Sequence, residues 1–439
     1  MRISRAALVA GGMLLVVVCL ALIRDLAAEQ TGTIDLRNRI VGARLQMDGK
    51  APYMYKWVAG DDTLRYYNPI NMGGISNSTA TPFFHTLLYP IANLPQRTIS
   101  YIWLFVEYAL LFISGLLALR LAGNNRQKIA VVITLALFLF TEAWKNHIAV
   151  GQLYLFFPCL ALIFYYCIRK RDNYVAAFFA GLFAIVLVLI RPNALVFFIP
   201  FLFLISNYSR KYLIVLLIPV VLVPACYFSF KNNRDFLKSF ISSTQGAIRG
   251  HQSFFYPGNP PLPIKMAYLS EWEGWKKTAT DSMTTVIKPF RYSEHGNVFV
   301  IYTAITKKHM PISVMNLLSA LCILVLAGIC LRLRKTQKHI ELPNIAILGF
   351  CLYMISDLFS PIWRHQYYTT QWLFPLLLAA ALYQKANKWV YALLLAGLVL
   401  NIVNTSYIKM EHTIGEYLML FTFIYLSLMK PMAEKMKAG

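Results

Sequence analysis

The stretch that decides the fold class is residues 174–190, which read YVAAFFAGLFAIVLVLI and end at Arg191-Pro192-Asn193. The run contains no charged side chain, and as a helix rising about 1.5 Å per residue it comes close to spanning the hydrocarbon core of a bilayer, which is about 30 Å thick. Apolar runs of this kind recur from one end of the 439-residue chain to the other. The sequence therefore predicts a polytopic, all-α membrane protein.

The composition excludes the other broad classes. Apolar residues make up 58% of the chain and charged residues 14%, and the mean hydropathy is +0.54. Because a soluble domain carries about 25% charged residues, we exclude a soluble enzyme, a disordered chain and a secreted disulfide scaffold. The seven cysteines all lie inside apolar runs and have no metal-binding spacing.

About twelve spans are predicted, in a single membrane domain covering residues 1–439. The first is interpreted as an uncleaved helix in preference to a cleaved signal peptide, because its apolar run exceeds the usual length of a signal core. The sixth is short, so we expect it to be tilted, re-entrant or paired with its neighbour. The predicted spans are residues 6–27, 99–121, 128–146, 150–168, 174–190, 194–207, 211–230, 312–331, 343–360, 367–384, 388–405 and 415–430.

The charge pattern predicts the orientation. The chain has 42 Lys and Arg against 19 Asp and Glu, a net charge of +23. The basic residues gather in the short connections on one side, as they do in cytoplasmic loops, so both termini are predicted to be cytoplasmic. Two long polar and aromatic loops, residues 28–98 and 231–311, then lie outside an inner (plasma) membrane. No basic face typical of nucleic-acid binding is visible.

Asp35 is the first candidate for chemistry, because it lies a few residues past the first predicted span. A carboxylate at the membrane surface can act as a general base towards a hydroxyl group. The alternative is that Asp35 caps a helix beginning at Leu36. Two further carboxylates in the same loop, Asp61 and Asp62, are interpreted as a solvated turn because no other acidic ligand lies at a fixed spacing.

Three other polar positions stand near the predicted membrane surface. Arg191 and the Arg364-His365 pair suit recognition of a phosphate group, although Arg191 can also snorkel to the interface and His365 can be an ordinary interfacial histidine. Gly151 permits a close backbone approach and Gln152 can bind a sugar hydroxyl, with helix packing as the alternative. From the residues alone, both interpretations of each position stay open.

Taken in order, these pieces resemble glycosyltransferase family 87, whose members are polytopic enzymes of the GT-C superfamily. One departure is Arg364-His365, where family members often have consecutive histidines. The resemblance rests on the order of several short motifs: Asp35; Asp48-Gly49-Lys50-Ala51-Pro52-Tyr53; Tyr66 to Pro69; Pro82 to Phe84; Gly151-Gln152; Arg191-Pro192; and Ser360-Pro361-Ile362-Trp363 with His365.

The resemblance implies a GT-C-like bundle that transfers a hexose, often mannose, from a polyprenyl phosphate to a lipid-linked or glycan acceptor. The transfer takes place on the extracytoplasmic side and inverts the anomeric centre. Asp35, in the first loop, is the expected catalytic base. No cofactor is predicted, and metal dependence stays open. The expected substrate-binding residues are Arg191, His365, Arg364, Gln152, Tyr53, Tyr67 and Asn68.

Two alternatives stay open from the sequence. A lipid-linked glycan ligase or polymerase would keep its essential basic residues in the second long loop, which here contains Arg249, His251, Arg291 and His295. A lipid or sugar transporter would place charges or broken helices at the membrane midplane. In this chain the predicted spans are mostly uncharged, which favours the glycosyltransferase.

Overall fold

The computed structural model describes residues 5–29, 34–56, 60–66, 75–78, 80–254, 297–306, 310–337, 341–359, 364–382, 388–402 and 411–428. Two predicted site residues, Tyr67 and Asn68, lie outside these ranges, as do Arg291 and His295 of the second long loop. Within them the chain is helical, as predicted, apart from one two-stranded sheet.

The described helices run along the whole chain. The α-helices are α1 (Arg5–Glu29), α2 (Ile34–Met47), α3 (Thr63–Tyr66), α4 (Pro82–Ala92), α5 (Gln96–Leu121), α6 (Asn125–Leu139), α7 (Glu142–Val150), α8 (Phe156–Ile168), α9 (Tyr174–Ile190), α10 (Leu195–Phe198), α11 (Arg210–Ser229), α12 (Lys231–Phe254), α15 (Val298–Thr306), α16 (Ile312–Gln337), α17 (Leu342–Leu358), α18 (Leu373–Leu382), α19 (Lys388–Val399) and α20 (Glu411–Leu428). Three 3-10 helices are η1 (Pro192–Ala194), η2 (Ile199–Asn207) and η4 (Gln366–Trp372).

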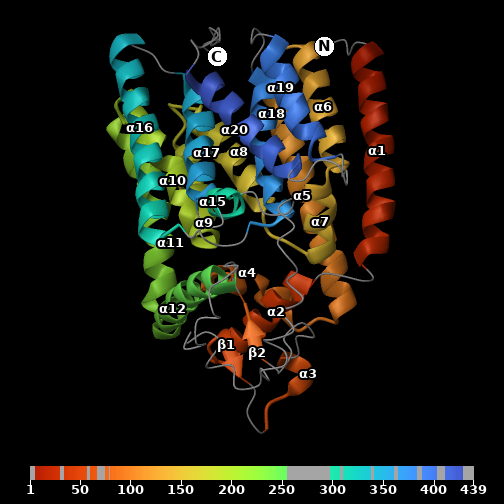
Figure 1. Cartoon of the computed structure of the whole chain (residues 1–439), viewed down its shortest axis with the longest axis vertical. Helices are drawn as coiled ribbons and strands as arrows, with labels where there is room; N and C mark the ends of the chain where they lie inside the picture. The colour runs from red at the N-terminus through yellow and green to blue at the C-terminus, as the bar shows by residue number, and fades with distance from the viewer. Residues whose placement is uncertain are drawn as a thin grey trace.

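The long helices stand side by side as a bundle (Figure 1). A group of smaller elements, which we name the cap, lies at one end of it and consists of α2, α3, α4, β1, β2 and α12. The first turn of α1 and the last turn of α20 lie at the other end (Figure 1). The elements from α2 to α4 of the first long loop and α12 of the second therefore lie at the end of the bundle opposite these two turns, whereas α15 of the second loop lies among the bundle helices (Figure 1).

Not every predicted span is one straight helix. Of the described helices, α5 and α11 are each long and apolar enough to cross a membrane. Helices α6 and α7 meet the same criterion only together, as a span bent by 58°. Several shorter apolar helices accompany them, among them α8, α9, α17 and α19. The chain therefore has membrane-spanning character, and the total of twelve spans stays a prediction.

Four of the predicted spans are not single straight helices in the structure. Residues 128–146 break between α6 and α7, where the Thr141 hydroxyl caps α7 by accepting from the backbone N–H of Trp144 at 3.1 Å. Residue 150 ends α7, and residues 151–155 precede α8 as a turn. Residues 194–207 form α10 and η2, with Pro200 lacking a helical donor. The span at 367–384 begins with η4.

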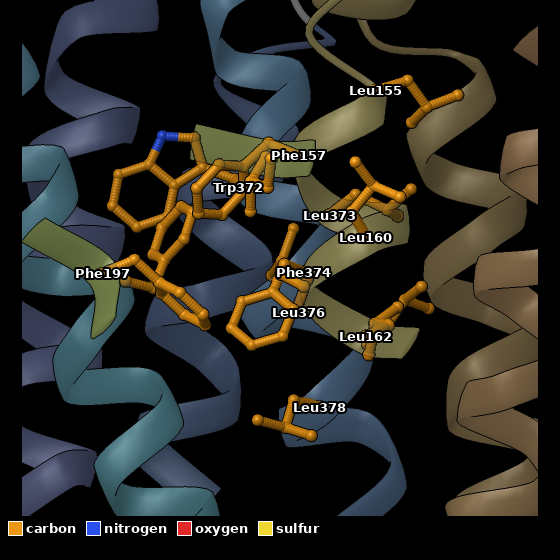
Figure 2. Close-up of a cluster of buried hydrophobic side chains, with 14 of the residues drawn as sticks. Leu155, Phe157, Leu160, Leu162, Phe197, Trp372, Leu373, Phe374, Leu376 and Leu378 are labelled. Carbon is orange, nitrogen blue, oxygen red and sulfur yellow. The ribbon is translucent and has the colours of Figure 1, made fainter. Parts of the chain in front are cut away.

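The centre of the bundle is a close-packed aromatic and aliphatic core (Figure 2). Phe157 of α8 stacks on Tyr353 of α17 with ring centroids 4.3 Å apart. Phe197 of α10 meets the Phe374 ring of α18 edge-on at 5.5 Å. Edge-to-face and offset contacts of this kind add to the free energy gained by close packing. This core packs α8, α10, α17 and α18 against one another inside the bundle.

Helices α9 and α11 pack with their backbones in close contact. A Cβ added at Gly181 of α9 would lie 1.9 Å from the backbone oxygen of Leu216 in α11, so any larger side chain must push the two helices apart. Small residues at helix contacts are typical of membrane bundles, because close packing of the backbones drives helix association there.

The cap has its own polar framework. Strands β1 (Tyr53–Lys56) and β2 (Ile75–Asn77) pair antiparallel with an irregular register. The predicted solvated turn is only partly right, because Asp61 accepts hydrogen bonds from Lys50 and from the Tyr55 hydroxyl, whereas Asp62 is exposed. The first long loop is therefore an ordered structure wherever it is described.

The orientation leads to a direct test. If both termini are cytoplasmic, a cysteine placed at position 77 or 259 should react with a membrane-impermeant maleimide from the outer side of intact cells. The native cysteines would be replaced, and a cysteine in the basic connection at residues 169–171 serves as the control for the opposite side. If positions 77 and 259 were labelled only after the cells are opened, the orientation would be the opposite of the predicted one.

Candidate active site

The predicted base, Asp35, is held where the cap meets the bundle. Helix α2 begins at Ile34, so Asp35 lies within its first turn and does not precede the helix as a cap residue. A carboxylate there is favoured by the helix dipole. Asp35 is partly buried, and its Oδ2 accepts a hydrogen bond from Nε2 of Gln152, 117 residues away in the sequence.

Gln152 follows a tight turn at the end of α7. Gly151 adopts the left-handed conformation at φ 66° and ψ 56°, which favours glycine and ends the helix. The backbone N–H of Gln152 then donates to the His147 carbonyl at 3.0 Å. The Gln152 side chain is buried, with 2% of its surface exposed, and it meets Asp35 on one side and Arg39 of α2 on the other.

His365 lies near enough to Asp35 for the charge of the carboxylate to act on its ring. Its ring stacks on Tyr367 with centroids 5.0 Å apart, and Tyr367 in turn stacks on Tyr154 at 5.6 Å. Burial lowers the pKa of His365 below its ordinary value, and the nearby charge of Asp35 opposes this shift only in part. His365 is therefore neutral at neutral pH and offers a hydrogen bond in place of a positive charge.

Arg191 lies at the C-terminal end of α9 among tyrosine rings. Its guanidinium carbon is 4.6 Å from the centre of the Tyr154 ring and 5.4 Å from that of Tyr368. One nitrogen, Nη2, pairs with Asp357 of α17 at 2.8 Å. Its Nε is buried and has no hydrogen-bond partner among the residues that the structure describes. The guanidinium of Arg191 is therefore only partly paired within the described residues.

Arg364 is enclosed by two carboxylates. It contacts Asp357 through Nη1, and it binds Glu416 of α20 at 2.5 Å through Nη2 and at 3.1 Å through Nε. Glu416 also accepts from the Trp372 indole at 2.9 Å. Only 2% of the Arg364 side chain is exposed. The four charges of Arg191, Asp357, Arg364 and Glu416 therefore balance in one buried network.

Tyr53 belongs to the interior of the cap. Its hydroxyl donates to the Ala80 carbonyl at 2.7 Å, and its ring contacts His85 and Phe240 with centroids 5.7 and 5.4 Å away. These contacts tie β1 to α4 and α12. Its predicted role in substrate binding stays a prediction.

Three polar residues of this region were missed from the sequence: Arg39, Asp357 and Glu416. Asp357 and Glu416 are carboxylates inside the predicted spans 343–360 and 415–430, and a charge at such a position is a sign of a buried partner or a functional site. Arg39 lies four residues after Asp35 on the same helix, so the two share one face. These signals were present but did not identify the partners.

Two features of the site bear on cofactors and on the alternative enzyme class. Among the residues that the structure describes, no group of three or more His, Cys, Asp or Glu side chains could hold a metal ion. Of the second-loop residues that a ligase would need, Arg249 and His251 lie in α12. Helix α12 contacts α4 and β1 of the cap, so the ligase or polymerase alternative is left to the activity test.

The fold is that of a helical membrane protein, and a cluster of buried and partly buried polar residues, among them Asp35 and Arg191, forms its candidate active site. The model of glycosyltransferase family 87 matches residues 79–361, more than half of the chain. The chain belongs to glycosyltransferase family 87 and is a membrane glycosyltransferase.

Other comparisons add little. No curated protein matches the chain. Among solved structures, the apo crystal structure of the Archaeoglobus fulgidus oligosaccharyltransferase is similar over 95% of this chain and 56% of that one, with 14% identity and a TM-score of 0.38. This chain thus spans just over half the length of that enzyme.

Proposed function

We propose that the protein transfers a hexose, in the first instance mannose, from a polyprenyl-phosphate-sugar to a lipid-linked or glycan acceptor on the extracytoplasmic face. Asp35 is the general base. The observation that carries the proposal is the convergence of Asp35, Gln152 and His365, which come from three distant segments of the sequence. Helix α7 contacts both α2 and η4, so the fold holds these segments together.

In the proposed reaction Asp35 takes the proton of an acceptor hydroxyl. The hydroxyl oxygen bonds to the anomeric carbon while the bond from that carbon to the donor phosphate oxygen breaks. The phosphate leaves with the electron pair from the opposite face, which inverts the anomeric centre. Because a phosphate is a good leaving group, one carboxylate suffices, in contrast to the pair used in glycoside hydrolysis.

Arg191 is the proposed ligand of the donor phosphate. Its unpaired Nε and its position against tyrosine rings support this role, because arginine binds phosphate oxygens through several directed N–H groups. His365 adds a neutral hydrogen bond. The double engagement of Arg364 by Asp357 and Glu416 supports a framework role for that residue in place of direct phosphate binding.

The test of the reaction uses the purified full-length protein in detergent. Incubation with polyprenyl-phosphate-mannose and a lipid extract should yield a new mannolipid, and the Asp35→Asn protein should not produce it. Transport of the donor across vesicles without any product would favour a transporter. Transfer of a preassembled glycan in place of a single sugar would favour a ligase or polymerase.

Donor binding provides a second test. Arg191→Ala should raise the donor KM by about 10- to 100-fold, the cost of a lost hydrogen bond to a charged group. His365→Ala should raise it less, because a neutral imidazole contributes no charge, and its effect should depend little on salt. Arg191→Lys is the control for folding, since it keeps a charge beside Asp357. An unchanged donor KM in both alanine variants would place the phosphate elsewhere.

A further inference from the structure

Arg39 is a buried arginine that binds two neutral oxygens. It lies one helical turn after Asp35, with 5% of its surface exposed. Its Nη1 donates to the Gly151 carbonyl at 2.6 Å, and its Nη2 donates to Oε1 of Gln152 at 2.5 Å. Burying a guanidinium is costly unless its charge is compensated. The Asp35 carboxylate, on the other side of Gln152, is the negative charge that can compensate the buried guanidinium of Arg39.

We infer that Arg39 fixes the orientation of the Gln152 amide and through it the position of the Asp35 carboxylate, so that Arg39 is a positioning residue for proton abstraction. This inference rests on the proposed role of Asp35 as the base. It adds a residue that neither the sequence motifs nor the family match assigns to the site.

The chemistry of the three groups permits only one arrangement. A guanidinium has donors and no acceptor, an ionised carboxylate has acceptors and no donor, and an amide has one end of each kind. With Arg39 in place, the oxygen of Gln152 must face Arg39 and its nitrogen must face Asp35. A flipped amide would set oxygen against carboxylate and N–H against guanidinium, so both contacts would become repulsive.

We name Arg39, Gln152 and Asp35 together the relay. Among the residues that the structure describes, the titratable groups affected by the charges of the relay are His365 and Tyr367 on the η4 side and His85 on α4. Burial and the charge of Arg39 lower the pKa of His85 to about 3, and its Nε2 lies 2.6 Å from the Ser78 hydroxyl. His85 and His365 are therefore neutral at neutral pH, as is Tyr367. Among these groups, Arg39 and Asp35 carry the charge.

The test compares Arg39→Met with a matched variant on the same helix, Arg44→Met. Arg44 also donates to backbone carbonyls, those of Ala92 at 2.7 Å and Arg65 at 3.1 Å, but it lies outside the relay. We expect Arg39→Met to lower kcat by about 100-fold, as a misplaced catalytic group does. The donor KM should not change. Arg39→Lys should restore part of the rate, because its ammonium can reach one of the two oxygens.

The pH profile separates positioning from general loss of stability. In Arg39→Met the acid limb of kcat against pH should move to higher pH, because the carboxylate loses an ordered hydrogen-bond donor. Gln152→Glu should shift the acid limb in the same direction, because the new carboxylate repels the charge of Asp35. The variant should stay folded, since Arg39 can still bind the new carboxylate. Arg44→Met should leave the limb in place even if it lowers thermal stability.

The outcomes distinguish this inference from the proposed function. If Asp35→Asn turns over normally, the proposed base and the positioning role both fail. If Asp35→Asn is inactive while Arg39→Met and Gln152→Glu keep the pH profile of the native protein, only the positioning role fails. All rates would be measured on the full chain with polyprenyl-phosphate-mannose and the lipid extract.

Discussion

Asp35→Asn is expected to abolish sugar transfer while leaving the protein folded and able to bind its donor. Loss of a general base typically lowers the rate by about 10²–10⁴-fold. The asparagine has nearly the size of aspartate, and its Oδ1 can still accept the hydrogen bond that Gln152 donates to the carboxylate. Transfer assays and donor-binding measurements on the same preparation would separate chemistry from binding.

The matched control is Asp62→Asn in the same loop. Asp62 is exposed and accepts a hydrogen bond from the Arg65 backbone N–H at 3.0 Å, so its replacement should have little effect on turnover. Near-normal turnover in a folded Asp35→Asn protein would remove Asp35 from the mechanism. It would leave this carboxylate as a structural partner of Gln152 at the start of α2.

The largest loss of stability is expected from Glu416→Ala. Glu416 binds Arg364 through both carboxylate oxygens and also accepts from Thr369 and Trp372, each at 2.9 Å. Removing one partner of a buried ion pair leaves an uncompensated charge and costs about 3–5 kcal/mol. The thermal unfolding temperature in detergent should therefore fall clearly, and donor binding should weaken because Asp357 links Arg364 to Arg191.

Glu142→Ala is the control for this effect. The pair between Glu142 and Lys145 is also an ion pair, at 2.6 Å, but its side chains are 21% and 38% exposed. An exposed pair contributes about 0–1 kcal/mol. Equal losses of stability in Glu416→Ala and Glu142→Ala would contradict the structural role of the buried network.

The sequence by itself determined the class of fold and the order of its helices. Predicted spans such as 99–121, 174–190 and 211–230 coincide closely with α5, α9 and α11. The reason is local, because a continuous apolar run that must satisfy its backbone hydrogen bonds within a membrane forms a helix. Family membership was also visible in the order of short motifs.

Only the tertiary structure decided which polar residues meet. The sequence separates Asp35 from Gln152 by 117 positions and Arg191 from Asp357 by 166, and no local pattern states that either pair is in contact. It also did not show that Arg364 is enclosed by carboxylates, or that His365 is neutral. Hydrogen bonds and desolvation depend on groups that packing brings together. The partners of a buried charged residue are therefore set by the tertiary fold and not by the residues next to it in the sequence.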